Sequence, residues 1–180
     1  MGIEVRYIND KMTDEQVDAL FDGNTRLVFG ETITNPALTV LDISRYAAIA
    51  HRHGVPLVVD NTFATPLLCR PFEFGADIVT HSTSKYMDGH ANVLGGVIVD
   101  GGSFDWAASG RYPELTQADE SYHGVVYTEK FGRAAYVTKA RVQLLRDLGC
   151  APVPLAAYLL NLGLESMAVR VQRHSENALA

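Results

Sequence analysis

Leu57-Val58-Val59-Asp60-Asn61-Thr62 begins as an apolar run that ends on an aspartate, and a second run, Asp77 to Thr80, leads into His81-Ser82-Thr83-Ser84-Lys85-Tyr86. The unbroken first run favours a strand that is buried on both faces of a sheet. Between the two runs, Pro66 is placed to open a helix and Gly75 to close it. The order strand, helix, strand therefore predicts two parallel strands whose carboxyl ends meet at one edge.

The same alternation of strands and helices extends through the first half of the chain. Further strands are expected at residues 3–8, 26–29 and 95–99. Thr13 and Gln16 have the spacing of a capping box and predict a helix through Phe21, and Asp42 is suited to cap a helix that Gly54 ends. The expected fold class is α/β: a mostly parallel sheet covered by helices, with ligand sites beyond the carboxyl ends of its strands.

The second half of the chain has a different character. Residues 103–124 mix Gly, Pro, Ser and charged residues, and predict an irregular excursion with a short helix around Trp106. Apolar residues at helical spacing predict a long helix from about Phe131 that ends at Gly149. Two more helices are expected, over residues 152–162 and 165–180.

Length, composition and charge exclude several classes of protein. The 180 residues are 47% hydrophobic, which is enough for one domain with a core. The formal charge of −6 argues against a nucleic acid or an anionic membrane as partner, and no stretch approaches the ~20 apolar residues of a membrane span. The amino terminus carries charges where a signal peptide is apolar, and Cys69 and Cys150 are too few for a disulfide framework, so a cytoplasmic location is expected.

Of the four lysines in the chain, only Lys85 follows a strand that is expected to be buried. Its amine is therefore expected at the ligand edge of the sheet, where it can form a Schiff base with an aldehyde cofactor. Lys11 lies in a polar turn, and Lys130 and Lys139 fall in or beside helices and are interpreted as solvated charges. A surface lysine at the start of a loop is the simpler alternative for Lys85.

Three further side chains accompany Lys85. Ser82 and Ser84, with nearby backbone N–H groups, can donate hydrogen bonds to a phosphate. Asp60 is expected within ~10 Å, across neighbouring strands, and a carboxylate there keeps a pyridine nitrogen protonated. Each residue also has a purely structural interpretation, as a strand-end cap for Asp60 and as turns for the serines. As an ordered set they indicate pyridoxal 5′-phosphate (PLP) as the cofactor.

Several motifs resemble those of one enzyme family, in the same order along the chain. They are Glu31 to Pro36, Val59 to Phe63, His81 to Lys85, Gly95 to Val97, Asp100 to Trp106, Ser121 to Gly124, Ala140 to Gly149 and Arg173 to Ala178. On these residues the chain resembles the PLP enzymes of cysteine and methionine metabolism, and it is most similar to the O-acetylhomoserine sulfhydrylases. The resemblance implies the central part of the large domain of fold type I, the aspartate-aminotransferase-like fold.

The resemblance also implies a role for each matching residue. Lys85 would hold the cofactor and move protons at the substrate carbons, and Asp60 would pair with the pyridine nitrogen. Ser82 and Ser84 would bind the phosphate, although the family usually has threonine at the second position. Asn35 would lie near the phenolic oxygen of the cofactor. The implied reaction is γ-replacement, in which sulfide, or methanethiol in some members, displaces acetate from O-acetylhomoserine to give homocysteine or methionine.

The loop that follows the lysine departs from the family pattern. It keeps Gly89 and His90 but carries Met87 and Asp88, whereas the family often has glycines in this loop. Together with His81, the acidic and histidine residues here could suggest a metal site. Their spacing fits no common ligand pattern, so no metal is expected.

Members of the family are more than twice as long as this chain. The resemblance therefore implies a central segment, with residues 1–164 as a partial cofactor-binding large domain and 165–180 as the start of a helix leading to a small domain. The isolated chain is expected to be inactive, and a full-length parent to be a tetramer that acts on a small amino acid with sulfide or a thiol. The open alternatives are a cystathionine γ-synthase or methionine γ-lyase type of enzyme, and a non-catalytic chain that binds PLP weakly or associates with a full-length relative.

Overall fold

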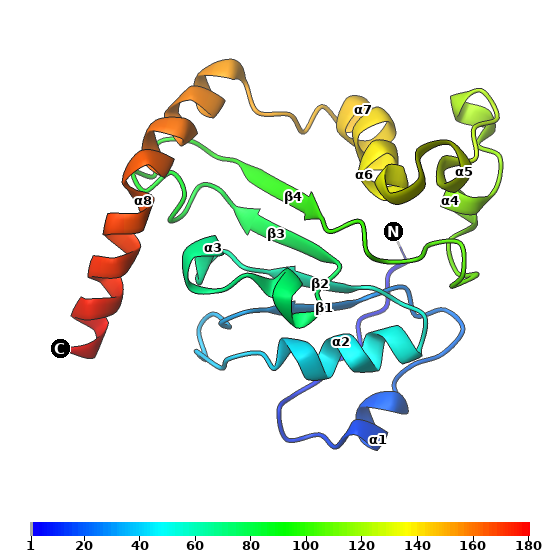
Figure 1. Ribbon diagram of the computed structural model, residues 1–180, viewed down its shortest axis with the longest axis horizontal. Helices are drawn as coiled ribbons and strands as arrows, with labels where there is room; N and C mark the ends of the chain where they lie inside the picture. Colours follow the sequence, from blue (N-terminus) through cyan, green and yellow to red (C-terminus); the bar gives the residue numbers. More distant parts are fainter. Residues whose placement is uncertain (1) are drawn as a thin grey trace.

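A four-stranded sheet forms the centre of the computed structural model, which describes residues 2–180 (Figure 1). The strands are β1 (Val28–Glu31), β2 (Leu57–Asp60), β3 (Ile78–Ser82) and β4 (Gly96–Asp100), in the order β1-β2-β3-β4. Strands β1, β2 and β3 are parallel, and β4 is antiparallel to β3. The prediction of a mostly parallel sheet is confirmed. Strand β4 runs the other way because residues 83–95 join it to β3 without a crossover helix.

Helices alternate with the strands in the first half of the chain and dominate the second half. The α-helices are α1 (Asp14–Asp18), α2 (Ile43–Arg52), α3 (Thr65–Leu68), α4 (Pro113–Thr116), α5 (Tyr127–Phe131), α6 (Ala135–Lys139), α7 (Arg146–Leu148) and α8 (Pro154–Leu179). The 3₁₀ helices are η1 (Pro71–Phe74), η2 (Glu120–Tyr122) and η3 (Gly132–Ala134), and η4 (Ala140–Leu145) is a π-helix. None of the helices within residues 2–180 has the length and apolar character needed to span a membrane.

Helix α2 covers one face of the sheet, below it in Figure 1. The Asp42 carboxylate accepts a hydrogen bond from the Arg45 N–H at 3.0 Å and caps the helix as predicted. Gly54 follows the helix at φ +68°, a conformation that glycine adopts without strain. The core on this face joins Ile43, Tyr46, Ala47, Ile49 and Ala50 of α2 to Val28, Leu57, Val59 and Val79 of the sheet.

The opposite face of the sheet is covered only in part. Val58 and Ile78 are aligned on that face and pack against an aromatic cluster from the second half of the chain. The cluster contains Phe104, Trp106, Tyr112, Tyr122, Tyr127, Phe131 and Tyr136. Phe29, aligned with Val58, and Ile98, aligned with Thr80, remain 57% and 52% exposed. An apolar part of this face therefore contacts solvent.

Two expectations for the amino-terminal segment are wrong. Residues 3–8 pair with no strand among those described, and Arg6 instead anchors the segment to Asp22 by an ion pair of 2.6 Å. An alternating pattern forms a strand only where a neighbouring strand is available. Thr13 and Gln16 do make the predicted capping box, but α1 ends at Asp18 rather than at Phe21.

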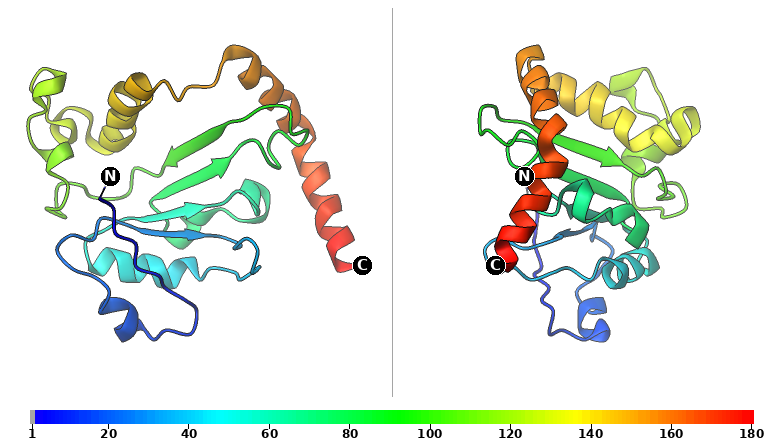
Figure 2. Two further views of the ribbon diagram at one scale, coloured as in Figure 1. Left: turned by 180° about the vertical axis from the view of Figure 1, so that it is seen from behind. Right: turned by 60° about the vertical axis from the view of Figure 1, so that its left-hand side comes forward.

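The second half also differs from expectation in three places. Trp106 lies in a turn and not in a helix, where it is 5% exposed and stacks on Tyr136. The single helix expected from Phe131 is divided among α5, η3, α6, η4 and α7, although Gly149 ends it as predicted. The two helices expected over 152–162 and 165–180 are one helix, α8, which runs through Gly163 and passes beside the loop joining β3 to β4 (Figure 2).

Lys139 is not the solvated charge that its sequence context suggests. Its Nζ lies 2.6 Å from the Asp119 carboxylate and 4.5 Å from the centre of the Tyr127 ring, and only 16% of its side chain is exposed. The ion pair ties the irregular segment 103–124 to helix α6. Hydrogen bonds from Lys139 and then from Ser121 hold the pKa of Asp119 at about 2.

Acid is expected to weaken the fold through this ion pair. The pKa of Asp119 is about 2 in the folded chain, against an ordinary value of 3.8, so its contribution to the free energy of unfolding is present above pH ~4 and is lost as the pH falls toward ~2. In Asp119→Asn, the free energy of unfolding should therefore vary less steeply with pH in that window. Urea unfolding at a series of pH values measures the slope, with the exposed Glu120→Gln as control. A slope unchanged by Asp119→Asn would contradict this role.

Candidate functional site

The carboxyl ends of β2 and β3 bring Asp60 and Ser82 to one edge of the sheet. Asp60 ends β2 and is aligned with Thr80, and Ser82 lies two residues further along β3. Because side chains alternate along a strand, these three residues share one face. Lys85 follows in the turn after β3, where its N–H donates to the Ser82 carbonyl at 3.2 Å and its side chain is exposed. Asp60, Ser82 and Lys85 thus lie at the edge that their sequence positions predict.

Thr62, a residue for which no role was predicted, links the two strand ends. Its N–H donates to Oδ1 of Asp60 at 2.8 Å, and its Oγ1 accepts a hydrogen bond from the Ser82 N–H, also at 2.8 Å. The first bond is the local turn that an aspartate makes with the N–H two residues on, so the Asp-Asn-Thr order carried a usable signal. Asp60 and Ser82 are therefore joined through a single residue.

Three polar groups at this edge have no hydrogen-bond or ion-pair partner within residues 2–180. They are Nζ of Lys85, Oδ2 of Asp60 and Oγ of Ser82, since the bonds at Asp60 and Ser82 use only Oδ1 and the backbone N–H. An amine can attach an aldehyde, a carboxylate oxygen can accept from a protonated pyridine nitrogen, and a hydroxyl can donate to a phosphate. This donor set fits PLP.

Ser84 and Asn35 are less available to a ligand. The Ser84 hydroxyl accepts from the Gly95 N–H at 2.9 Å and donates to the Gly95 carbonyl at 3.3 Å. Asn35 is exposed in the loop after β1, and its N–H donates to the Glu31 carboxylate at 2.9 Å. In the described part of the chain, no hydrogen bond joins Asn35 to the other predicted site residues. Ser84 would have to exchange its bond to Gly95 for one to a phosphate, so both roles stay predictions.

Two buried polar residues support this edge from within the fold. The His81 side chain lies on the face of β3 opposite to Ser82 and is 6% exposed; its burial lowers its pKa, against an opposing effect of the Asp60 charge, and keeps the imidazole neutral at pH 7. Asn61 is fully buried, accepts from the Thr32 hydroxyl and donates to the Cys69 carbonyl, both at 2.8 Å. These contacts fix the segment that follows Asp60. Nothing in the local sequence distinguishes such an asparagine from one in an ordinary turn.

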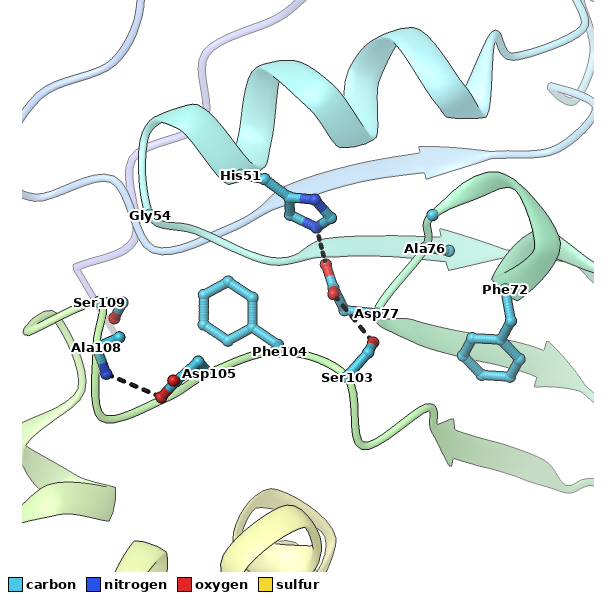
Figure 3. A pocket seen from close by; sticks show the side chains of 11 residues that line it. His51, Gly54, Phe72, Ala76, Asp77, Ser103, Phe104, Asp105, Ala108 and Ser109 are labelled. Atoms are coloured by element: carbon cyan, nitrogen blue, oxygen red, sulfur yellow. Dashed lines mark hydrogen bonds and ion pairs between the residues drawn. The ribbon is translucent and has the colours of Figure 1, made fainter.

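A separate hollow of about 490 Å³ lies at the opposite edge of the sheet, where β3 begins (Figure 3). Oδ2 of Asp77 lies 2.8 Å from Nε2 of His51 and accepts from the Leu57 N–H at 2.8 Å. Its Oδ1 accepts from the Ser103 hydroxyl at 3.4 Å. Both oxygens of this buried carboxylate are engaged, which indicates a structural role. No group of three or more potential metal-ligating side chains occurs within residues 2–180.

Comparison with known proteins gives one consistent family. A family model described as Cys/Met metabolism PLP-dependent enzyme matches residues 1–180. The homocysteine/cysteine synthase of Saccharomyces cerevisiae is 46% identical over 180 residues, which cover 99% of this chain and 40% of that protein. The O-acetyl-L-homoserine sulfhydrylase 1 of Thermus thermophilus is also 46% identical over 180 residues, covering 99% of this chain and 42% of that protein. The chain thus spans only about 40% of the length of these relatives.

Two solved structures have the same fold. An O-acetylhomoserine (thiol)-lyase from Campylobacter jejuni, solved with N′-pyridoxyl-lysine-5′-monophosphate, has a TM-score of 0.85 and 35% identity over 91% of this chain and 41% of that chain. The O-acetylhomoserine sulfhydrylase of Wolinella succinogenes has a TM-score of 0.77 and 37% identity over 93% of this chain and 44% of that chain. These similarities confirm the predicted fold and the family resemblance. The chain belongs to the PLP-dependent enzymes of cysteine and methionine metabolism.

Proposed function

We propose that this chain forms the cofactor-binding part of a PLP-dependent O-acetylhomoserine sulfhydrylase. The observation that carries the proposal is the unpaired amine of Lys85 at one sheet edge with a carboxylate oxygen of Asp60 and the hydroxyl of Ser82. The names of the similar proteins support the same reaction class. When bound, PLP supplies an electron-withdrawing ring that stabilises negative charge on a substrate carbon.

Each side chain acts on a defined part of the cofactor or substrate. Lys85 attaches the cofactor through its amine, and then takes and returns protons at the α- and β-carbons of the substrate. Asp60 accepts from the pyridine nitrogen and keeps it protonated. Ser82 would donate to the phosphate, Ser84 would do so only by giving up its bond to the Gly95 carbonyl, and Asn35 would donate to the phenolic oxygen.

The proposed reaction replaces the group on the γ-carbon of O-acetylhomoserine. Removal of the α-proton and then of a β-proton allows acetate to leave from the γ-carbon. Sulfide then adds to that carbon, and return of the protons gives homocysteine, with methanethiol giving methionine instead.

A comparison of substrates tests this reaction against its alternatives. The full-length parent protein loaded with PLP should form homocysteine and acetate in equal amounts from O-acetylhomoserine and sulfide. Cystathionine formed from an activated homoserine and cysteine would instead favour a cystathionine γ-synthase, and methanethiol released from methionine would favour a methionine γ-lyase. Cofactor bound at Lys85 of the parent without any turnover would favour a non-catalytic protein. The 180 residues alone are expected to be inactive under either hypothesis.

The organisation of the parent protein is part of the same proposal. Residues 1–164 belong to the PLP-binding large domain, and residues 165–180 carry helix α8 toward a second domain. The assembled protein is a cytoplasmic homo-oligomer, a tetramer. It has no nucleic-acid or membrane partner, and the formal charge of −6 supports this last part of the proposal. Sedimentation equilibrium of the protein with and without PLP tests the oligomeric state.

Ser82→Ala and Ser84→Ala are expected to have different effects. The Ser84 hydroxyl bonds both backbone groups of Gly95, so Ser84→Ala should lower the free energy of unfolding by about 1 kcal/mol. The Ser82 hydroxyl has no partner within residues 2–180, so Ser82→Ala should change that free energy by less than ~0.5 kcal/mol while weakening PLP binding. Urea unfolding and PLP titration measure the two effects. Equal destabilisation by both substitutions would contradict the conclusion that the Ser82 hydroxyl is free for a ligand while the Ser84 hydroxyl stabilises the fold.

A further inference from the structure

Helix α8 holds the loop that directly follows Lys85. Nη1 of Arg170 donates to the Tyr86 carbonyl at 2.8 Å, and Nη2 lies 3.5 Å from the Met87 carbonyl oxygen. Nη2 also donates to the Gly163 carbonyl, about two turns earlier on the same face of α8, at 2.7 Å. A guanidinium presents several donors in a fixed plane, so one side chain can hold helix and loop together. Arg170 thus anchors the two carbonyls that come immediately after Lys85.

Two glycines allow the helix and the loop to approach this closely. A methyl group on Gly163 would overlap the Asp88 carbonyl oxygen and lie 2.6 Å from the Met87 carbonyl oxygen. A methyl group on Gly89, which has φ +72°, would lie 2.5 Å from the guanidinium carbon of Arg170. Glycine inside a helix is unfavourable by itself. The close approach of the loop gives a physical reason for its presence at Gly163.

The loop is a closed turn in which Lys85 takes part. The Gly89 N–H donates to the Lys85 carbonyl at 2.8 Å. The Asp88 side chain is fully buried, and its Oδ2 accepts from the N–H groups of His90 at 3.1 Å and Asn92 at 3.0 Å. Asp88, which departs from the family pattern, therefore stabilises the turn.

Aromatic contacts join the loop after Lys85 both to helix α8 and to the segment that follows β2. The Tyr86 ring lies 5.6 Å from the His174 ring of α8, edge to face, and 6.2 Å from the Phe63 ring. Phe63 directly follows Thr62, which binds the ends of β2 and β3. The loop after Lys85 is therefore held between α8 and the segment that positions Asp60.

We propose that Arg170 is a positioning residue for Lys85. It acts through the Tyr86 and Met87 carbonyls and fixes the main chain from which the Lys85 amine reaches the cofactor. The Lys85 side chain is exposed and flexible, so a fixed main chain is what limits the volume that its amine samples. The inference rests on the proposed cofactor role of Lys85. It also makes the integrity of α8 a condition for cofactor attachment.

Amide hydrogen exchange in the chain without cofactor tests the loop contact directly. The reporting amides are Asp88, Gly89, His90 and Asn92, which are all bonded within the loop or to its base. In Arg170→Gln they should exchange about ten- to hundredfold faster, the effect of losing hydrogen bonds to a charged group. Arg170→Lys, which keeps the charge but not the planar fork, should give an intermediate rate.

Two further variants make the exchange experiment specific. Arg173→Gln is the matched control, because Arg173 lies on the same helix with a 72% exposed side chain and pairs only with Glu176, at 3.2 Å, among the described residues. It should leave the loop rates unchanged. Gly163→Ala removes no polar group but forces the helix off the loop, and should accelerate the same amides.

Trapping of the cofactor then separates this inference from the proposed function. PLP is added, bound cofactor is reduced with borohydride, and mass spectrometry gives the fraction of Lys85 that carries it. Arg170→Gln should need about tenfold more PLP for half-labelling, and Arg170→Lys should recover part of the loss.

Each outcome of the two measurements has a defined meaning. Unchanged exchange with unchanged labelling in Arg170→Gln would overturn the inference and leave the role of Lys85 intact. Faster exchange with unchanged labelling would show that Arg170 stabilises only the loop, which also overturns the positioning role. Absence of labelling in the unaltered chain would overturn the proposed function of Lys85 and, with it, the inference.

Discussion

Lys85→Ala is expected to abolish covalent attachment of PLP to the chain. The chain has four lysines, and Lys139 is committed to an ion pair with Asp119. The Lys85 amine has no partner within residues 2–180. Lys85 itself lies in the turn that follows Ser82, the last residue of strand β3. Borohydride reduction followed by intact mass measurement should show one phosphopyridoxyl group on the unaltered chain and none on the variant.

Two matched variants make this result specific. Lys85→Arg retains the positive charge but cannot form the attachment at neutral pH, so it should also remain unlabelled. Lys11→Ala removes another exposed lysine and should be labelled like the unaltered chain. Full labelling of Lys85→Ala at a different lysine would refute the assignment of Lys85.

Asp60→Asn is expected to weaken PLP binding by about ten- to hundredfold. A hydrogen bond to a charged group contributes about 1.5–3 kcal/mol, and the substitution removes the charge that would face the pyridine nitrogen. The amide oxygen of asparagine can still accept from the Thr62 N–H, which lies 2.8 Å from Oδ1 of Asp60. The fold should therefore persist. Titration of PLP against the Lys85 labelling signal measures the loss.

Glu31→Gln is the control for charge at the same edge. Glu31 is aligned with Asp60 on the neighbouring strand β1, and its carboxylate accepts from the Asn35 N–H. Removing its charge should leave PLP binding within about threefold of the unaltered chain, the size of a typical surface effect. Equal losses in the two variants would indicate a general charge effect and not a contact between Asp60 and the cofactor.

The predicted end of strand β2 at Asp60 is accurate, whereas β3 continues to Ser82, two residues beyond the predicted Thr80. The run from Leu57 to Asp60 is apolar and short, and the register aligns Asp60 with Thr80 as two parallel strands require. The identity of Lys85 as the candidate amine followed from the same placement. The fold class and the family were therefore accessible from the sequence.

The contacts that assemble the site could not be predicted from the sequence. Thr62 bonds Ser82 across two strands, and Ser84 is engaged by Gly95 on the far side of a loop. Both interactions depend on tertiary distances that no local pattern encodes. The same reason explains why the ion pair of Lys139 could not be predicted, since its partner Asp119 lies in a segment with no regular pattern.

The sequence predicts two helices over residues 152–162 and 165–180, and Gly163, a residue of low helix propensity, lies between them. The helix continues because the backbone of residues 87–88 packs against that glycine. A rule based on propensity alone takes such a glycine for an end, whereas here it marks a contact surface. The error therefore coincided with the place where α8 meets the loop of Lys85.

The bridge formed by Thr62 has a consequence for the energetics of ligand capture. Two hydrogen bonds of Thr62 fix the spacing between Asp60, which would receive the ring of the cofactor, and Ser82, which would receive its phosphate, before the cofactor binds. Such preorganisation reduces the loss of conformational entropy that otherwise opposes association. Affinity at this edge would then depend on rigidity as much as on the number of contacts, and Thr62 would set the spacing that a ligand has to match.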